Sequence, residues 1–164
     1  MKSWELRQPE AANLFNPAFV GLLIYKAALK YREAAGKCLP YSLAFLIPPI
    51  VLHPQTVKTI RLGQGASFQK WANENQPTKI GFAARARNLV PHIRESLLFL
   101  VRSGVISILE DASLSPNAPV RLIRRKHKFS ETDALTIKHA ETLGRWFAEG
   151  GTSATIYATL GVKP

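Results

Sequence analysis

The residues best suited to chemistry are few and widely spaced in this 164-residue chain. The four histidines are His53, His92, His127 and His139, and no two have the spacing of about three to five residues that brings two imidazoles to one metal ion. The single cysteine, Cys38, opens an apolar segment, which is typical of a buried and unreactive thiol. One cysteine also excludes a disulfide framework. We therefore expect no metal and no other cofactor.

Carboxylates that could act as general acids or bases are equally scarce, since Asp and Glu together number 11. Two clusters stand out, Glu110-Asp111 and Glu131 with Asp133. The first lies at the tip of a predicted hairpin, and the second opens a predicted helix, where acidic residues interact favourably with the helix dipole. The Gly63-Gln64-Gly65 stretch lacks the Lys-Ser/Thr of a P-loop and the spacing of a dinucleotide fingerprint. No pattern supports catalysis, so we predict a protein that is not an enzyme.

The basic residues are more informative than the candidate catalytic ones. Lys and Arg number 22, which gives a formal net charge of +11. Ten of these eleven net charges lie between residues 34 and 128, whereas residues 129–164 are close to neutral. Such a field attracts polyanions, usually nucleic acid or an acidic protein surface. The hydrophobic content of 46% excludes a disordered basic tail, which would have too little to bury.

Two basic sets could face a polyanion, and we predict both as DNA-binding. The first set lies on a predicted long helix, on roughly one face at about 100° per residue: Arg87, Arg94 and Arg102. The second set follows the predicted hairpin loop: Arg121, Arg124, Arg125, Lys126 and Lys128. Cations on a hairpin can contact a phosphate backbone. They also discourage edge-to-edge strand pairing, so a solvated strand edge stays open as the alternative.

Three aromatic residues are candidates for a partner interface. Trp4 lies in a polar N-terminal segment, where an aromatic side chain has little of its own element to pack against. Trp146 and Phe147 lie in a helical pattern, and such residues are found both in cores and as anchors at interfaces. We predict all three as interface residues and leave the core interpretation of Trp146 and Phe147 open.

Most of the elements that must position these residues are predicted to be helical. Asn16-Pro17 is a typical helix start, and the helix is expected to reach Ala35 and end at Gly36. An apolar segment from Pro40 to His53 predicts a core helix kinked by Pro48-Pro49. Further predicted helices span about 57–62, 67–75, 81–103 (bent or divided at Pro91), 130–149 and 152–160. Strands are predicted at 105–109 and 120–123, with a loop over 113–119.

The charge-free stretch from Cys38 to Val57 is long enough to span a bilayer, but its prolines favour a buried core helix. The N-terminus has no apolar signal segment, so we expect a cytoplasmic protein without membrane contact. The predicted fold class is mainly α with one β-hairpin. The order of elements over 67–149 is that of a winged-helix domain. We predict one domain over 1–164, with an N-terminal helical half (13–62) and a winged-helix-like half with C-terminal helices (67–164).

Three stretches carry a resemblance to a known family. They are Asn16-Pro17-Ala18-Phe19 with the helix that follows, Leu39 to His53, and Lys138 to Pro164 with its Gly144-Arg145-Trp146-Phe147 segment. Together they resemble the middle component of bacterial three-component ABC systems of the Lamassu anti-phage type. The resemblance covers about Asn13 to Pro164, and its motifs are not catalytic signatures.

The resemblance implies a small adapter subunit. In such systems the middle component lies between an SMC-like or Rad50-like ABC ATPase and an effector, often a nuclease, and it could also touch double-stranded DNA. The residues by themselves also allow a free-standing winged-helix DNA-binding regulator, which would recognise a defined duplex alone. An enzyme of unrecognised type is the third alternative.

Overall fold

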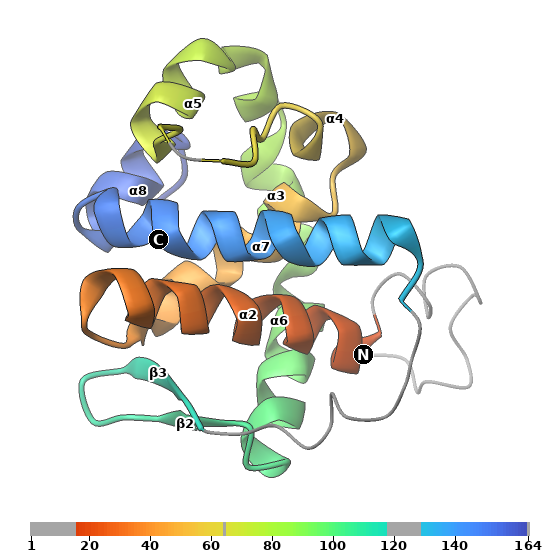
Figure 1. Ribbon diagram of the computed structural model, residues 1–164, viewed down its shortest axis with the longest axis vertical. Helices are drawn as coiled ribbons and strands as arrows, with labels where there is room; N and C mark the ends of the chain where they lie inside the picture. The colour runs from red at the N-terminus through yellow and green to blue at the C-terminus, as the bar shows by residue number, and fades with distance from the viewer. Residues whose placement is uncertain (1–15, 64, 118–128, 164) are drawn as a thin grey trace.

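The computed structural model describes residues 16–63, 65–117 and 129–163. In these ranges helices enclose one hydrophobic core, and a small antiparallel three-stranded sheet lies at one side (Figure 1). The described elements are α2 (Pro17–Ala35), β1 (Leu39–Pro40), the 3-10 helix η2 (Tyr41–Leu46), α3 (Ile47–Val51), α4 (Pro54–Val57), α5 (Phe68–Glu74), the 3-10 helix η3 (Gln76–Lys79), α6 (Phe82–Arg102), β2 (Ile106–Ile108), β3 (Ser113–Pro116), α7 (Glu131–Glu149) and α8 (Ser153–Thr159). The predicted class, mainly α with a hairpin, is confirmed, whereas the winged-helix arrangement stays a prediction.

The helix starts follow from local capping. The Asn16 side chain accepts a hydrogen bond from the Ala18 amide at 2.9 Å, and Pro17 takes the first helical position of α2. Ser67 caps α5 in the same way. Ser130 and Asp133 form a capping box at the start of α7, with Asp133 in the place usually taken by Glu or Gln. These predicted helix starts are therefore confirmed.

Two helices, α2 and α7, form the centre of the fold. They lie side by side, and α6 crosses behind them (Figure 1). The close approach depends on Gly144 of α7, because a Cβ atom there would overlap the backbone carbonyl of Ala27 in α2. An ion pair between Lys26 Nζ and Glu141 Oε1, at 3.1 Å, also joins the two helices.

The predicted helix over 40–53 is divided. Residues 41–46 form the 3-10 helix η2, and the α-helix α3 begins only at Ile47. Pro48 and Pro49 occupy the first turn of α3, where the missing amide hydrogens cost nothing. The two prolines therefore start a helix rather than kink one. The segment is buried in the core, as predicted, and the part of the chain that the structure describes contains no helix long and apolar enough to cross a membrane.

The predicted helix over 57–62 is wrong in its position. The helix α4 covers Pro54–Val57, and His53 caps it, because the His53 Nδ1 atom accepts a hydrogen bond from the Thr56 amide at 3.3 Å. Residues 60–63 form no regular element. This irregular segment lies beside α5 and contributes to the cleft described below.

The hairpin also differs from its prediction. The loop expected over 113–119 is wrong for residues 113–116, which form β3 and pair with β2. Asp111 closes the short turn, because its Oδ1 atom accepts hydrogen bonds from the Ser113 amide and hydroxyl at 3.0 and 2.6 Å. On its other side β3 pairs with β1, a strand that the sequence did not predict, with Leu39 opposite Leu114. The strand predicted at 120–123 lies outside the described residues.

The long helix α6 covers Phe82–Arg102, close to its predicted range of 81–103. It ends at Arg102, and Gly104 follows with a φ of 68°, as expected for a glycine just beyond a helix. The helix continues through Pro91 as one element, so of the two predicted effects of Pro91 the division is wrong, whereas the bend stays a prediction.

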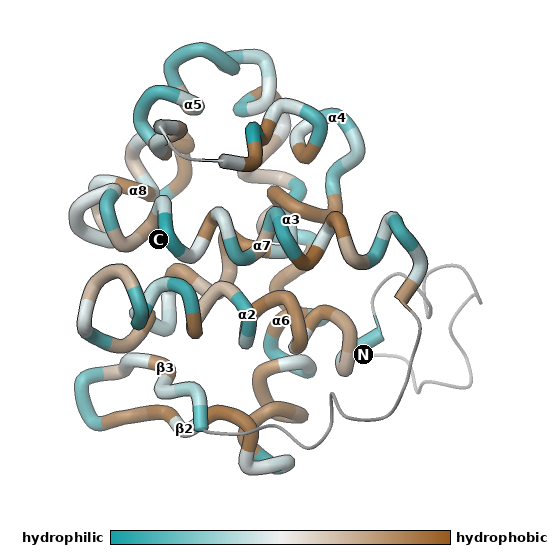
Figure 2. Tube along the Cα trace, viewed as in Figure 1, coloured by the Kyte–Doolittle hydropathy of each residue, from teal (hydrophilic) through white to brown (hydrophobic). Residues whose placement is uncertain are grey.

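Hydropathy separates the interior from one end of the molecule. Much of α2 and the α3 segment is apolar, whereas the region of α4 and α5 is largely hydrophilic (Figure 2). The hydrophilic end is where side chains suited to polar ligands gather.

Candidate partner surface and anion cleft

The arginines predicted on the long helix lie on its outer face. Arg87, Arg94 and Arg102 are all exposed on α6. At about 100° per residue they fall within one face about 80° wide. Arg85 lies well off that face at about 100° per residue, and its guanidinium donates hydrogen bonds to the Thr78 and Ile80 carbonyls at 3.0 and 3.1 Å. The prediction that these three arginines share one face of a helix agrees with the structure.

Apolar side chains share this outer face of α6. At about 100° per residue, Leu98 lies between Arg94 and Arg102, and Val101 lies next to Arg94 at the edge of the face. Their side chains are 50% and 37% exposed. Further apolar side chains are exposed where β2 ends, at Ile108 and Leu109. Exposed apolar side chains beside arginines make this face a candidate for contact with another macromolecule. We call the face made of Arg87, Arg94, Leu98, Val101 and Arg102 the α6 face.

The other predicted contact residues do not add to the α6 face. The basic run of Arg121, Arg124, Arg125, Lys126 and Lys128 lies outside the described residues, and so does Trp4. Trp146 and Phe147 are completely buried in the core. Phe147 packs edge to face on Phe68, with ring centroids 5.4 Å apart. Of the two interpretations left open for Trp146 and Phe147, the structure supports the core, and neither ring is exposed on the outer surface as an anchor for a protein partner.

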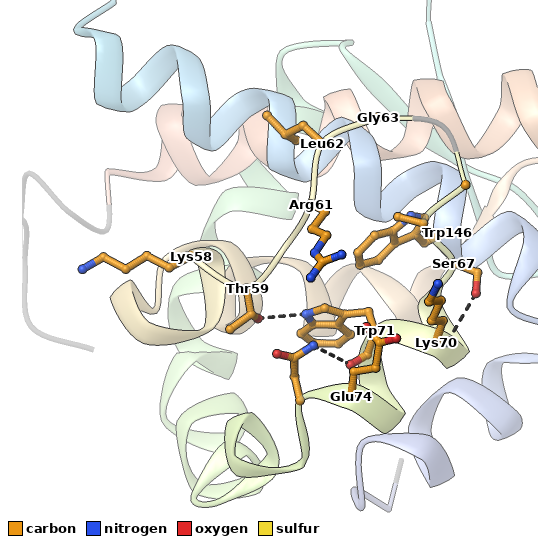
Figure 3. A pocket seen from close by; sticks show the side chains of 13 residues that line it. Lys58, Thr59, Arg61, Leu62, Gly63, Ser67, Lys70, Trp71, Glu74 and Trp146 are labelled. Atoms are coloured by element: carbon orange, nitrogen blue, oxygen red, sulfur yellow. Dashed lines mark hydrogen bonds between the residues drawn. The ribbon is translucent and has the colours of Figure 1, made fainter.

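A cleft of about 720 Å³ lies between residues 58–63 and 65–67, the helix α5 and Trp146 of α7 (Figure 3). Its wall contains two packed indoles, Trp71 and Trp146, whose ring centroids are 5.8 Å apart. The Trp71 indole nitrogen donates to the Thr59 hydroxyl at 2.9 Å. The loop at the rim is held to α7 because Arg145 donates a hydrogen bond to the Gly63 carbonyl at 3.0 Å. The cleft is therefore formed by residues far apart in sequence.

The cleft is positively charged. Among the described residues, Lys58, Arg61 and Lys70 line it, against one carboxylate, Glu74. Among the described residues none of these three cations forms an ion pair. A neighbouring hollow between α2 and α7 differs, because its Lys30 pairs with Glu33 at 2.6 Å. Arg61 and Lys70 reach towards the indole pair from the loop and from α5, while Lys58 extends away along the rim (Figure 3).

The sequence did not predict this cleft. Lys58, Arg61 and Lys70 appear there only as single charges beside Gly63-Gln64-Gly65 and Trp71. The one signal that the sequence contains is the group of unopposed cations on either side of a glycine-containing loop. The described residues contain no group of three His, Cys, Asp or Glu side chains that could hold a metal ion.

Buried histidine makes the stability of the fold sensitive to pH. His139 of α7 is 6% exposed, and burial lowers the pKa of its imidazole. Contacts with the backbone of Ile60 and Leu135 raise this pKa, but by less. Burial also lowers the pKa of His53, and the charge of Arg85 acts in the same direction.

We expect the free energy of unfolding to fall as the pH is lowered from 7 to 5.5. Below about pH 6.5 the histidines of the unfolded chain take up protons that the folded chain does not bind, so unfolding becomes easier. Urea unfolding at both pH values measures the change. The variant His139→Gln should show a smaller difference between the two pH values, and an undiminished difference would contradict this assignment to His139.

Comparison with known proteins places the whole described fold in one family. A family model described as ABC-three component (ABC-3C) system Middle Component 3 matches residues 4–164. No curated protein matches the chain, and no solved structure does. The match includes α2, α6, α7 and both walls of the cleft.

Proposed function

Because the chain belongs to the Middle Component 3 family of ABC-three component systems, we propose that it is the non-enzymatic adapter that connects the ABC ATPase of its system to the effector. The observation that carries this proposal is the family match over residues 4–164, which is nearly the whole chain. Membership as a middle component implies an ABC ATPase and an effector as partners. The proposal adds that one chain contacts both.

The finer part of the proposal concerns the kind of system. The resemblance of residues 16–19, 39–53 and 138–164 to Lamassu-type middle components favours anti-phage defence. The ATPase would then be SMC-like or Rad50-like, and the effector a nuclease, acting in the cytoplasm. In this arrangement the ATPase senses foreign DNA, and the adapter transmits that state to the effector.

The α6 face is the surface that we assign to the ATPase. Arginines separated by exposed apolar side chains are common at protein interfaces, because the apolar groups supply buried area while the guanidinium groups pair with carboxylates. Leu98 is 50% exposed beside Arg94, so half of its surface is free to be buried by a partner. An acidic, partly apolar surface is therefore the complementary partner.

We expect the variant R87E/R94E/R102E to lose most of its binding to the ATPase. Reversing three charges replaces attraction by repulsion on one face, and the loss of each exposed ion pair costs about 0.2–1 kcal/mol before the repulsion is added. Co-purification of the ATPase with the tagged chain, followed by calorimetry, measures the loss. The control variant is Lys58→Glu with Lys79→Glu, which reverses two charges that lie outside the α6 face. ATPase binding that is equal in the variant and the wild-type chain would contradict the assignment.

Contact of the α6 face with double-stranded DNA is the alternative to the ATPase assignment, because the same three arginines would pair with phosphates instead of carboxylates. It is supported by the three exposed arginines and by the net charge of +11. Each arginine that binds a phosphate should, once replaced, reduce the slope of log affinity against log salt by about 0.9. Duplex binding by the isolated chain with a strong sequence preference would instead favour the stand-alone regulator.

A further inference from the structure

We propose that the cleft between residues 58–63 and 65–67, α5 and Trp146 binds a phosphate group, carried either by a free nucleotide or by a single-stranded nucleic acid. This site lies on residues that the α6 face does not include, so it goes beyond the adapter function and does not depend on it. Its three central residues are Arg61, Lys70 and Trp146.

The cleft gathers positive charge without a matching ion pair. Arg61 and Lys70 come from different segments and both reach towards the indole pair (Figure 3). No carboxylate among the described residues pairs with either cation. Two unpaired cations that converge on a concave surface focus a positive potential there, because the protein walls have a lower dielectric constant than water. An anion in the cleft would neutralise both charges at once.

One buried donor at the cleft has no partner. The Trp146 side chain is completely buried, yet its indole nitrogen donates a hydrogen bond to no described residue. Buried donors are nearly always partnered, by protein or by ordered water, since an unpaired one is costly. Trp146 lines the cleft, and its indole lies beside Arg61 and Lys70 (Figure 3). The missing partner is therefore expected to be an oxygen atom of a molecule in the cleft.

The cleft has the size and the lining of a phosphate site. Its volume of about 720 Å³ lies within the range of sites for nucleotide-sized ligands. Its lining includes the cations Lys58, Arg61 and Lys70, whereas the two indoles are buried, so the cations rather than base stacking would hold a ligand. A phosphate offers several acceptor oxygens and close to two negative charges near neutral pH. It thus suits both the two cations and the indole N–H.

The experiment uses the full-length chain and three probes: ATP, inorganic phosphate and a short single-stranded oligothymidylate. Binding is measured by quenching of tryptophan fluorescence and by calorimetry. Binding of ATP and phosphate that exceeds binding of the oligonucleotide identifies a free nucleotide as the source of the phosphate. Tighter binding of the oligonucleotide identifies a nucleic-acid strand. Absence of binding by all three at millimolar concentration would overturn the proposal.

The variants locate the binding. R61E/K70E should weaken it at least tenfold. The control Lys58→Glu lies on the same segment but extends away from the indoles, and it should change affinity less than threefold. Glu74→Gln should strengthen binding, because it removes the one carboxylate among the described residues that line the cleft. Equal affinities for R61E/K70E and the wild-type chain would overturn the proposal.

Trp146→Phe removes the indole N–H and keeps an aromatic ring. It should weaken phosphate binding about tenfold if it remains folded, as removal of a hydrogen bond to a charged group would. Should this variant fail to fold, R61E/K70E alone tests the proposal, because both side chains are exposed and their replacement should leave the fold intact.

A polyglutamate peptide that binds the cleft as well as the phosphate probes do would show a carboxylate site and overturn the proposal. R61E/K70E should still co-purify with the ATPase. A loss of phosphate binding at the cleft can therefore be told apart from a loss of the adapter function.

Discussion

Replacing Phe147 with alanine is expected to lower the free energy of unfolding of the isolated chain by about 4 kcal/mol. The side chain is completely buried and packs edge to face on Phe68 at 5.4 Å. Truncation removes the transfer free energy of a benzyl group and leaves a cavity that neighbouring helices can fill only partly. Urea unfolding without any partner protein measures the effect.

The matched control for that prediction is Phe99→Ala on α6, where the ring is 36% exposed. The same chemical change there should cost about 1 kcal/mol. This pair of variants separates a core residue from an interface residue, because an interface aromatic would leave the isolated chain unaffected and weaken only the complex. Equal unfolding midpoints for Phe147→Ala and the wild-type chain would restore the interface interpretation.

Replacing Gly144 with alanine should destabilise the chain by about 2 kcal/mol or more. The added Cβ atom meets the Ala27 carbonyl, and backbone cannot move aside as a side chain can. Overpacking of this kind costs about 3 kcal/mol, from which the better helix propensity of alanine recovers about 1 kcal/mol. Thermal and urea unfolding both measure the change, which reports on the close contact of α2 with α7.

Gly21→Ala is the graded control for Gly144→Ala. Its Cβ would lie 3.1 Å from the Leu100 side chain, which can adjust by a small rotation. We expect a change in the free energy of unfolding of less than about 1 kcal/mol, since the propensity gain offsets the tighter packing. If Gly144→Ala proves as mild as Gly21→Ala, the two central helices must lie further apart than the structure places them.

The segment Gly144-Arg145-Trp146-Phe147, on which the family resemblance partly rests, acts in packing. Gly144 admits the backbone of α2, and Arg145 holds the Gly63 carbonyl. Trp146 lines the cleft, and Phe147 fills the core beside Phe68. Four successive residues of α7 therefore connect α2, the irregular loop and α5. Under the proposed adapter function, these residues would therefore position other surfaces of the chain.

Local signals made much of the fold predictable. The starts of α2, α5 and α7 depend on hydrogen bonds within three residues of Asn16, Ser67 and Ser130, so a sequence motif contains the whole cause. The end of α2 follows from Gly36, which adopts a φ of 66° that glycine tolerates. Predictions of this kind need no knowledge of the tertiary structure.

Features that depend on distant residues could not be predicted in the same way. The strand β1 has two residues and pairs with Leu114 across a long separation, so it shows no periodicity of its own. Pro48-Pro49 is compatible with a kink and with a helix start, and only the packing of η2 decides between them. The cleft joins Arg61 and Lys70 to Trp146, which no spacing rule connects. The α6 arginines were predictable because one helix presents them all.

The adapter function is the central claim, and reconstitution of the three components tests it most directly. The ABC ATPase, the effector and this chain are purified separately, mixed in pairs and together, and analysed by size-exclusion chromatography with light scattering. We predict that the ATPase and the effector elute as one complex only when this chain is present, and that each of them binds it in the pairwise mixtures. The adapter function would be contradicted if the ATPase and the effector co-eluted without this chain, or if the chain failed to bind one of the two.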